Sequence, residues 1–331
     1  MNYIITWFYR ESADEASFYP QMGQKGDSAL VHSIYMQIQV PFFHTFRRYN
    51  PEAGLLFFTN LQRDSLPRFL LETFDALRVK VITLPYTCRP PKDWYGAWQN
   101  QFYLYDILRD MEGRMQADDT VLVCDADCLC RSSLGPLFDE TRKRGSALYE
   151  FITDRTVSIN GITLPQMEAF YEACYGEPPR SPLAYYGGEF ITLRGDKVSL
   201  INRAFRELWQ FNLNRTSRNI PKLNEEAHVL SILAERLNLR NAIANRYVKR
   251  MWTSPQFNNV RPEDEHLAVW HLPYEKKRGL YRLFRLLEKQ KGLGDEACFW
   301  KKAKAWTGVP AVSLVKRLRD RWTTLLMLFT K

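Results

Sequence analysis

The first half of the chain alternates apolar runs of strand length with longer stretches of helical periodicity. The apolar runs occupy residues 3–9, 55–60, 79–85 and 120–124, and amphipathic stretches separate them. This alternation is the pattern that produces a parallel sheet with crossover helices. We therefore predict an α/β fold with a mostly parallel central sheet.

The composition is that of a protein with a large folded core. The 331 residues are 45% hydrophobic and 14% aromatic, which excludes fibrous and intrinsically disordered proteins. No run approaches the roughly 18 consecutive apolar residues that a membrane-spanning helix needs. Residues 1–15 have neither the basic start nor the small-residue cleavage site of a secretory signal, so we expect a cytoplasmic protein.

The net charge of +9 is concentrated at one end of the chain. Residues 271–331 contain 15 Lys and Arg against 5 Asp and Glu, so they carry +10 and the rest of the chain carries −1. This asymmetry indicates a neutral catalytic or binding body with a basic appendage that meets a phosphate group or an acidic membrane surface. We predict one domain over residues 1–272 and a basic helical extension over residues 273–331.

The extension ends in a predicted amphipathic helix, residues 312–329. Its basic residues lie mostly away from a face made by Val312, Val315, Leu318, Trp322, Leu325 and Phe329. Such a helix either packs its apolar face on the body or inserts that face into a membrane surface. The concentrated positive charge favours peripheral binding to the inner face of a membrane. A nucleic-acid binder is the weaker alternative, because no recognised binding motif accompanies these cations.

The sharpest local motif is Asp125-Ala126-Asp127, directly after the apolar run 120–124. Alternate residues of an extended chain point the same way, so both carboxylates can face one divalent cation. The carboxyl edge of a parallel sheet is also where ligands collect. A surface turn with two solvated acids is the alternative, but the position after a buried strand favours a metal site.

This motif and its surroundings resemble the nucleotide-sugar-binding core of GT-A glycosyltransferases. The resemblance rests on TVLVCDADCL followed by LGPLFDE, with strand and helix units before them and a glycine-led strand after them. It implies that Asp125 and Asp127 bind Mn²⁺ or Mg²⁺ and that Asp125 also contributes to holding the nucleotide sugar. A cation at this place offsets the charge that develops on the diphosphate as the sugar departs.

A strand-like segment is similar to the retaining family 6, which contains the blood-group transferases. YYGGEFITLRGD, residues 185–196, resembles that family's Tyr-Tyr-x-Gly strand beside the donor sugar. The resemblance implies that Gly187 and Gly188 let the backbone approach the sugar closely, whereas a simple bulge is the alternative. Residues 42–60 are also laid out like that family's helix and Phe-Thr-Asp strand, with Asn60 in place of the aspartate.

A second segment, NEEAHVLSIL, is similar to the His-Asp-Glu-Ser-His helix start of family 6. Aligning its histidine with His228 places Glu226 on the catalytic glutamate and Glu225 on the neighbouring aspartate. A carboxylate at a helix start lies at the positive end of the helix dipole, so we expect Glu226 to stay ionised. It could then act as nucleophile or stabilise an oxocarbenium-like centre. An ordinary first-turn acid is the alternative.

The region after residue 270 resembles the late His-x-x-Gly-x-x-Lys motif of family 8 transferases. His271 and Lys277 keep its spacing, although Tyr274 stands where glycine belongs. The resemblance implies that His271 is a third metal ligand and that Lys277 binds the diphosphate. In the transferases that the chain resembles, an aromatic residue stacks on the pyrimidine base, and Tyr9 at the end of the first strand could take this role. Trp7 and Phe8 compete for it, and core packing is the alternative for all three.

Together these features predict a metal-dependent glycosyltransferase of the hexosyltransferase type. We expect transfer from a nucleotide-diphosphate donor, most simply a UDP-sugar, to a glycan or a lipid-linked acceptor such as lipopolysaccharide, with retention of configuration. The resemblance spans about residues 3–252 in patches of low identity. A noncatalytic carbohydrate- or membrane-binding adaptor with the same sheet is the alternative.

Overall fold

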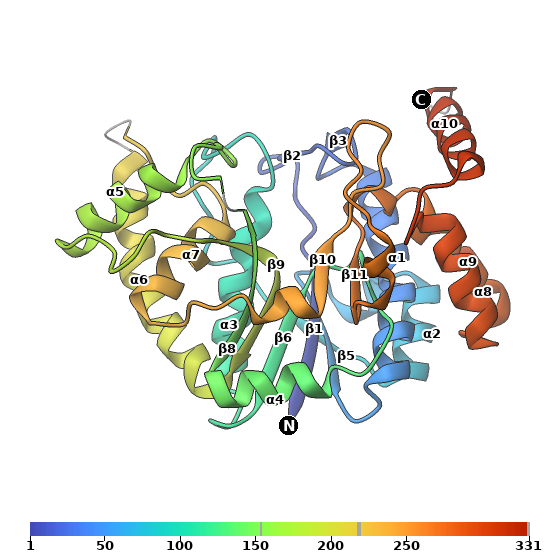
Figure 1. Cartoon of the computed structure of the whole chain (residues 1–331), viewed down its shortest axis with the longest axis horizontal. Coiled ribbons are helices and arrows are strands. Elements are labelled where there is room, and N and C mark those ends of the chain that lie inside the picture. Colours follow the sequence, from blue (N-terminus) through green and yellow to red (C-terminus); the bar gives the residue numbers. More distant parts are fainter. Residues whose placement is uncertain (153, 217–219, 330–331) are drawn as a thin grey trace.

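The computed structural model of the chain describes residues 1–152, 154–216 and 220–329. Within these residues a six-stranded sheet forms the centre, with helices on both faces (Figure 1). Its strands, in spatial order, are β5 (Lys80–Thr83), β4 (Gly54–Thr59), β1 (Asn2–Phe8), β6 (Thr120–Cys124), β9 (Tyr185–Arg194) and β8 (Ser146–Ile152). Only β9 runs against the common direction in this sheet. The predicted α/β fold with a mostly parallel central sheet is confirmed.

The strands of the central sheet have no polar face, because helices cover both faces of the sheet. In β4, Leu55 and Phe57 belong to the hydrophobic core on one side, and Leu56 and Phe58 belong to the core on the other. Alternate side chains of a strand point to opposite faces, so a strand between two layers of helices must be apolar throughout. The continuous apolar runs in the sequence follow from this burial.

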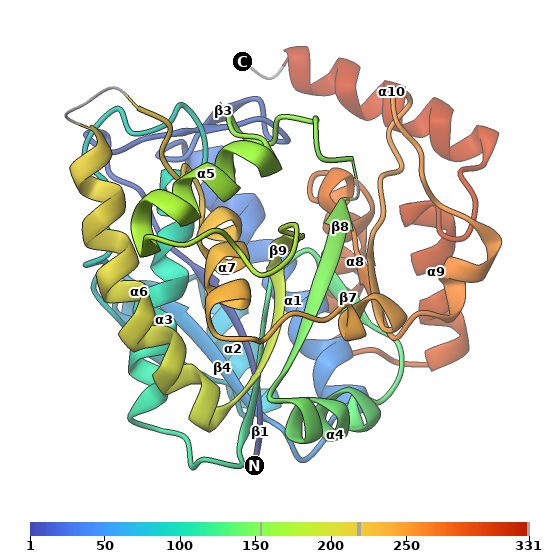
Figure 2. The same ribbon diagram turned by 60° about the vertical axis from the view of Figure 1, so that its left-hand side comes forward.

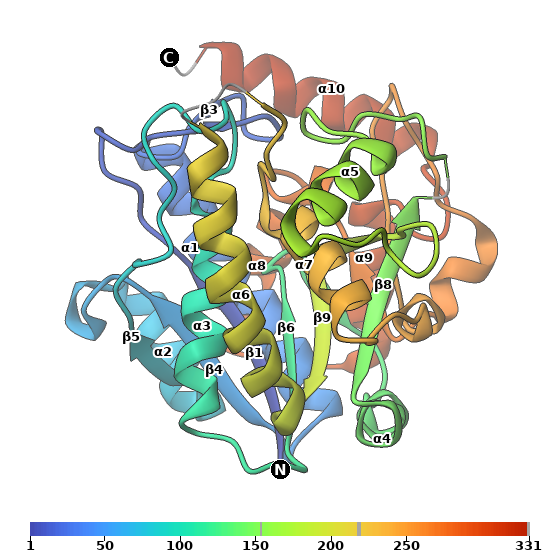
Figure 3. The same cartoon turned by 90° about the vertical axis from the view of Figure 1, so that its left-hand side faces the viewer.

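Two groups of helices cover the two faces of the sheet (Figure 3). One face is covered by α1 (Ala29–Tyr49), α2 (Arg68–Leu77) and α4 (Gly135–Arg144). The other is covered by α3 (Tyr103–Glu112), α6 (Gly195–Thr216) and α7 (Glu226–Arg236), with α5 (Leu164–Tyr175) packed on α7. Outside α1 lie α8 (Gly279–Gln290) and α9 (Glu296–Thr307), and α10 (Leu314–Phe329) ends the chain (Figure 2).

The sequence predicts that a helix is interrupted or begins anew near Pro41 and that Ser65 caps the next helix, and both predictions are wrong. Pro41 does not interrupt the helix before β4, because α1 continues through it. Helix α1 packs between the sheet and α8, and this burial of Ile38, Phe42 and Phe43 outweighs the backbone hydrogen bond that a proline removes. Ser65 does not cap α2, because it ends a short 3₁₀ turn and Pro67 precedes the first helical residue.

The connections create a crevice at the carboxyl ends of β1 and β6. The chain leaves β1 through α1 to β4 on one side, and later returns through α3 to β6 on the other side of β1. Ligand sites of open α/β sheets lie where the strand order reverses in this way. From β6 the chain passes into a second small sheet, whose order is β10 (Val248–Arg250), β11 (Val269–His271) and β7 (Cys128–Cys130).

The segment after β11 returns to the body of the protein before it forms the terminal helices. A 3₁₀ turn, Pro273–Glu275, precedes α8, and α8 packs on α1. The division of the chain into a domain over residues 1–272 and an extension over residues 273–331 stays a prediction. None of the helices in the described ranges combines the length and the apolar character that crossing a lipid bilayer requires.

Candidate active site

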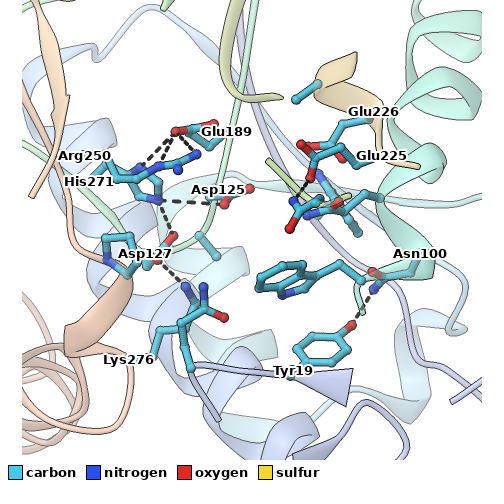
Figure 4. A pocket seen from close by; sticks show the side chains of 18 of the residues that line it. Tyr19, Asn100, Asp125, Asp127, Glu189, Glu225, Glu226, Arg250, His271 and Lys276 are labelled. Carbon is cyan, nitrogen blue, oxygen red and sulfur yellow. Dashed lines mark hydrogen bonds and ion pairs between the residues drawn. The ribbon is translucent and has the colours of Figure 1, made fainter. Parts of the chain in front are cut away.

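A cleft opens where β1 and β6 end, and most of the predicted site residues line it. Tyr9 follows β1, Asp125 and Asp127 follow β6, Glu226 begins α7, and His271 ends β11. The carboxylates of Asp125 and Asp127 and the imidazole of His271 lie on one side, and Glu225 and Glu226 lie across from them (Figure 4). The cleft therefore brings together residues that are up to 262 positions apart in the sequence.

Asp125, Asp127 and His271 form a compact group of possible metal ligands. One ligand atom from each lies within 4.8 Å of the others. The Nε2 atom of His271 is 3.4 Å from Oδ1 of Asp127 and 3.8 Å from Oδ2 of Asp125. Among the described residues, no other group of three His, Cys, Asp or Glu side chains lies close enough together to hold a metal ion.

Backbone pairing between the two sheets holds this group in place. His271 pairs with Cys128 in the antiparallel ladder of β11 and β7, and the amide of Leu272 donates to the carbonyl of Asp127 at 2.9 Å. The amide of Asp125 donates to the carbonyl of Glu189 on β9 at 3.1 Å. The acids thus lie in a short connection that is hydrogen-bonded to both sheets at once.

The two aspartates differ in their electrostatic surroundings. Asp127 is fully buried; burial raises its pKa, but the charge of Lys276 and the neighbouring His271 outweigh burial and hold the pKa below its usual range. The side chain of Asp125 remains 42% exposed. Partial burial and the charge of Asp127 raise the pKa of Asp125 to about 6.

The residues present fit a divalent cation. Oδ1 of Asp127 is buried and accepts no hydrogen bond from any described residue, although its partner oxygen binds Lys276. Two atoms that coordinate one octahedral ion at about 2.1 Å lie roughly 3 Å apart, so the two distances from Nε2 of His271 to the aspartate oxygens need only a small contraction. Two carboxylates with one imidazole are a donor set that suits divalent metals of the first transition row.

The lysine beside this group is Lys276, whereas sequence spacing selects Lys277. The ammonium of Lys276 donates to Oδ2 of Asp127, and its side chain is only 8% exposed. Lys277 points to another part of the surface, where its ammonium donates to the carbonyl of Met22 at 3.0 Å. The 3₁₀ turn after Leu272 determines which of the two faces the cleft, and a spacing match cannot detect that turn.

An ion pair between a buried acid and a partly exposed arginine lies behind His271, and sequence reasoning missed it. Glu189 on β9 accepts from the Nε atom of Arg250 on β10 at 2.6 Å, and its Oε1 is 3.8 Å from Nδ1 of His271. A Cβ atom on Gly187 would collide with the Glu189 carboxylate, so this glycine makes room for the acid. The sequence did contain a signal for this pair, because Glu189 stands inside the apolar segment 185–194. A charge buried with such a strand requires a partner.

Glu226 faces the cleft with a free carboxyl oxygen. It is the first residue of α7, and its buried Oε2 has no hydrogen-bond partner among the described residues. A Cβ atom on Gly188 would collide with this carboxyl group, so the second glycine of the pair makes room for Glu226. Gly187 and Gly188 therefore accommodate two acids of the cleft.

The surroundings of Glu226 oppose the ionised state that its position at a helix start predicts. Burial raises the pKa of Glu226 well above its ordinary value, and the charges of Glu225 and Asp125 raise it further. The helix dipole contributes at most about 2 kcal/mol to a charge, which is too little to offset full burial beside other acids. Glu225 has a different environment, since it accepts a hydrogen bond from Asn160 and its pKa is raised by burial to about 7.

His228 holds the start of α7 and is not a ligand of the cleft. It is fully buried, its Nδ1 accepts from the amide of Asn224 at 3.1 Å, and its Nε2 is 3.1 Å from the carbonyl of Ile159. Burial lowers its pKa to about 3, so the ring is neutral. This histidine ties the helix that carries Glu226 to the loop before α5.

Tyr9 lies in the cleft wall but is also packed as a core residue. Its ring contacts Tyr86 and Tyr103, with centroids 4.9 Å and 5.4 Å away. Its hydroxyl donates to Glu15 at 2.8 Å and accepts from Arg89 at 2.6 Å. Stacking of a base on Tyr9 stays a prediction.

Comparisons with known proteins give a similarity of fold. No protein-family model matches the sequence, and no curated protein matches it. Among solved structures, mouse xyloside xylosyltransferase 1 in its apo form is similar, with 11% sequence identity and a TM-score of 0.47. The similarity covers 82% of this chain and 97% of that chain. At this identity it specifies neither donor nor acceptor, so the chemistry has to be argued from the side chains of the cleft.

The position of Glu189 leads to a prediction about metal affinity. We expect Glu189→Gln to weaken Mn²⁺ binding about tenfold, because a carboxylate behind a ligating histidine orients the ring and raises its basicity. Glutamine still accepts from Arg250, so the ion pair is replaced by a hydrogen bond. Calorimetric titration with Mn²⁺ measures the effect, and Glu172→Gln, exposed on α5, is the matched control. Equal Mn²⁺ affinity in Glu189→Gln and the control would show that Glu189 has no such role.

Proposed function

We propose that this protein is a metal-dependent glycosyltransferase of the GT-A type. It transfers a sugar from a UDP-sugar to a glycan or lipid-linked acceptor, with retention of configuration. The observation that carries the proposal is the convergence of Asp125, Asp127 and His271 at the crevice between β1 and β6. The sequence resemblance to the GT-A core around the Asp-x-Asp motif agrees with this position.

The ligand group would hold a divalent cation against the diphosphate of the donor. Asp125 and Asp127 supply oxygen ligands, and Nε2 of His271 supplies nitrogen, a mixture that favours Mn²⁺ over Mg²⁺. A bound cation supplies positive charge where the nucleoside diphosphate becomes the leaving group. Because Asp125 is the more exposed of the two acids, it is the one placed to contact both cation and donor.

Lys276 takes the role that sequence spacing gave to Lys277. Burial lowers the pKa of Lys276, but the charges of Asp127 and other neighbours outweigh burial, and the pKa lies above its ordinary value. The ammonium therefore stays charged in the cleft. It neutralises Asp127 in the free protein and offsets charge on the departing diphosphate during the reaction.

Glu226 lies across the cleft from the ligand group, where the donor sugar would lie. Its carboxylate form would capture or stabilise the anomeric carbon, which gives retention. In the free protein, burial and the neighbouring acids raise the pKa of this carboxyl group well above its ordinary value. Positive charge that develops on the sugar as the bond to the diphosphate breaks stabilises the carboxylate form of Glu226.

The first test removes a ligand without disturbing the core. We expect Asp125→Asn to lower Mn²⁺-dependent hydrolysis of a UDP-sugar at least about 100-fold, because the cation loses a charged ligand beside the leaving group. The half-exposed position of Asp125 leaves the melting temperature nearly unchanged. Asp139→Asn on α4, whose side chain is 67% exposed, is the matched control. If the wild-type protein binds Mn²⁺ but turns over no nucleotide sugar, a noncatalytic adaptor replaces the transferase.

The second test separates the two adjacent lysines. We expect Lys276→Met to lower turnover about 100-fold, because it removes a buried cation beside the diphosphate position. Lys277→Met should change turnover by less than about threefold, because its ammonium binds the Met22 carbonyl. Steady-state rates of UDP release measure both variants, and melting temperatures exclude unfolding. A larger loss of turnover in Lys277→Met than in Lys276→Met would instead support the spacing of the family 8 motif, which assigns the diphosphate to Lys277.

The third test addresses Glu226. We expect Glu226→Gln to keep Mn²⁺ and UDP binding within about threefold while turnover falls about 100-fold, because the amide cannot become an anion. Glu207→Gln, exposed on α6, is the control. Calorimetry gives the binding and UDP release gives the rate. Full turnover in Glu226→Gln would exclude this residue from the chemical step.

A further inference from the structure

Helix α10 presents large apolar side chains to solvent. Leu314, Val315, Leu318 and Trp322 are 75%, 71%, 66% and 65% exposed, and we call these four residues the apolar stripe of α10. At 100° per residue they lie on one side of the helix. Single exposed hydrophobic residues are ordinary on protein surfaces, but a contiguous stripe of this kind marks an interaction site.

The helix is attached to the body by its charged side. Lys316 is fully buried, and its ammonium binds Glu275 at 2.8 Å and also Asp320 one helical turn later. Glu275 is fully buried as well and accepts from the amide of Gly279 at 3.0 Å. Lys316 and Asp320 lie on the side of α10 opposite the apolar stripe.

This attachment excludes one of the two alternatives that the sequence left open, the packing of these four apolar side chains on the body. An amphipathic helix that packs on its own protein buries the apolar face and leaves charges in solvent. In α10 the arrangement is the reverse, because the ion pair faces the body and the apolar stripe faces outward. The side chains of Leu325 and Phe329, which the sequence places on the same face, lie outside the described side chains.

Basic residues border the apolar stripe. Arg317 and Arg321 are exposed on one flank of it. On the other flank Arg319 lies near Arg282 of α8, and their mutual repulsion adds to burial in lowering the pKa of Arg282. The whole segment from residue 271 carries +10. A surface of this composition matches the headgroup region of an anionic bilayer, where tryptophan and aliphatic side chains insert and arginines meet phosphates.

We propose that the apolar stripe of α10, with its flanking arginines, binds the surface of an anionic lipid membrane. The helix lies at the end of the molecule toward which the parallel strands run, and the start of β1 and helix α4 lie at the opposite end (Figures 1, 2 and 3). Membrane binding through α10 therefore turns the cleft side of the protein toward the bilayer. In combination with the proposed function, on which this last point rests, that orientation favours a lipid-linked acceptor.

The test is cosedimentation of the full chain with lipid vesicles, without donor or metal. We expect vesicles of phosphatidylcholine with phosphatidylglycerol to bind the protein at least about tenfold more tightly than pure phosphatidylcholine vesicles. Binding should weaken with salt, because the attraction between exposed charges is screened. The absence of donor makes this result independent of whether the protein is a transferase.

Two variants of α10 separate the apolar and the electrostatic contributions. Leu318→Asp with Trp322→Asp prevents insertion of the apolar stripe into the bilayer, and Arg317→Glu with Arg321→Glu reverses the flanking charge. We expect each double variant to weaken vesicle binding at least about tenfold. For the arginines the reason is that one basic residue near such a surface contributes roughly fivefold to the affinity. Lys143→Glu with Arg144→Glu makes the same charge change on the exposed side of α4 and should bind like the unmodified protein. All changes lie at exposed positions, and melting curves verify folding.

Four outcomes would overturn the proposal. One is the absence of vesicle binding, and another is equal binding to neutral and anionic vesicles. A third is a stable dimer that dissociates in Leu318→Asp with Trp322→Asp and binds no vesicles, because the stripe would then join two copies of the chain. The fourth combines two results. Oligonucleotide binding is salt-sensitive and weakens in Arg317→Glu with Arg321→Glu, whereas vesicle binding is the same in every α10 variant.

Discussion

The burial of the Asp127 carboxylate is the constraint on which the cleft depends. A charge without solvent contact must be paired, and breaking such a pair costs about 3–5 kcal/mol. Asp127 finds its partners in Lys276, 149 residues later in the chain, and in His271. These contacts join the end of β6, the small sheet and the segment after β11. The cleft is therefore complete only when the C-terminal part of the chain has folded onto the central sheet.

Ion pairs that involve buried acids connect the cleft with the terminal helix. Glu189 and Arg250 lie behind His271, and Glu275 and Lys316 hold α10. Glu275 and Lys276 are neighbours in the chain, yet the first binds the helix and the second faces the cleft. One turn of backbone thus orients α10 and also supplies the cation beside Asp127. This shared turn explains why the apolar stripe of α10 has a defined direction relative to the cleft.

Much of the fold and part of the site could be predicted, because they depend on local patterns. The alternation of apolar runs and amphipathic stretches predicted the parallel sheet, and Asp125 and Asp127 were found because acids after a buried strand reach the edge of the sheet. Lys276 and the raised pKa of Glu226 were not predicted. The direction of Lys276 depends on a 3₁₀ turn, and the pKa of Glu226 depends on burial beside Glu225 and Asp125.

The sequence by itself determined the alternation of strands and helices in the first half of the chain, the acid pair after β6 and the basic character of the last 61 residues. Only the tertiary structure decided that Arg250 pairs with Glu189, that Lys276 rather than Lys277 enters the cleft, and that α10 turns its apolar stripe outward. The physical reason is that hydrophobic periodicity is a property of neighbouring residues, whereas the partner of a buried charge comes from a distant part of the chain. Which face of a helix is buried follows from those distant partners.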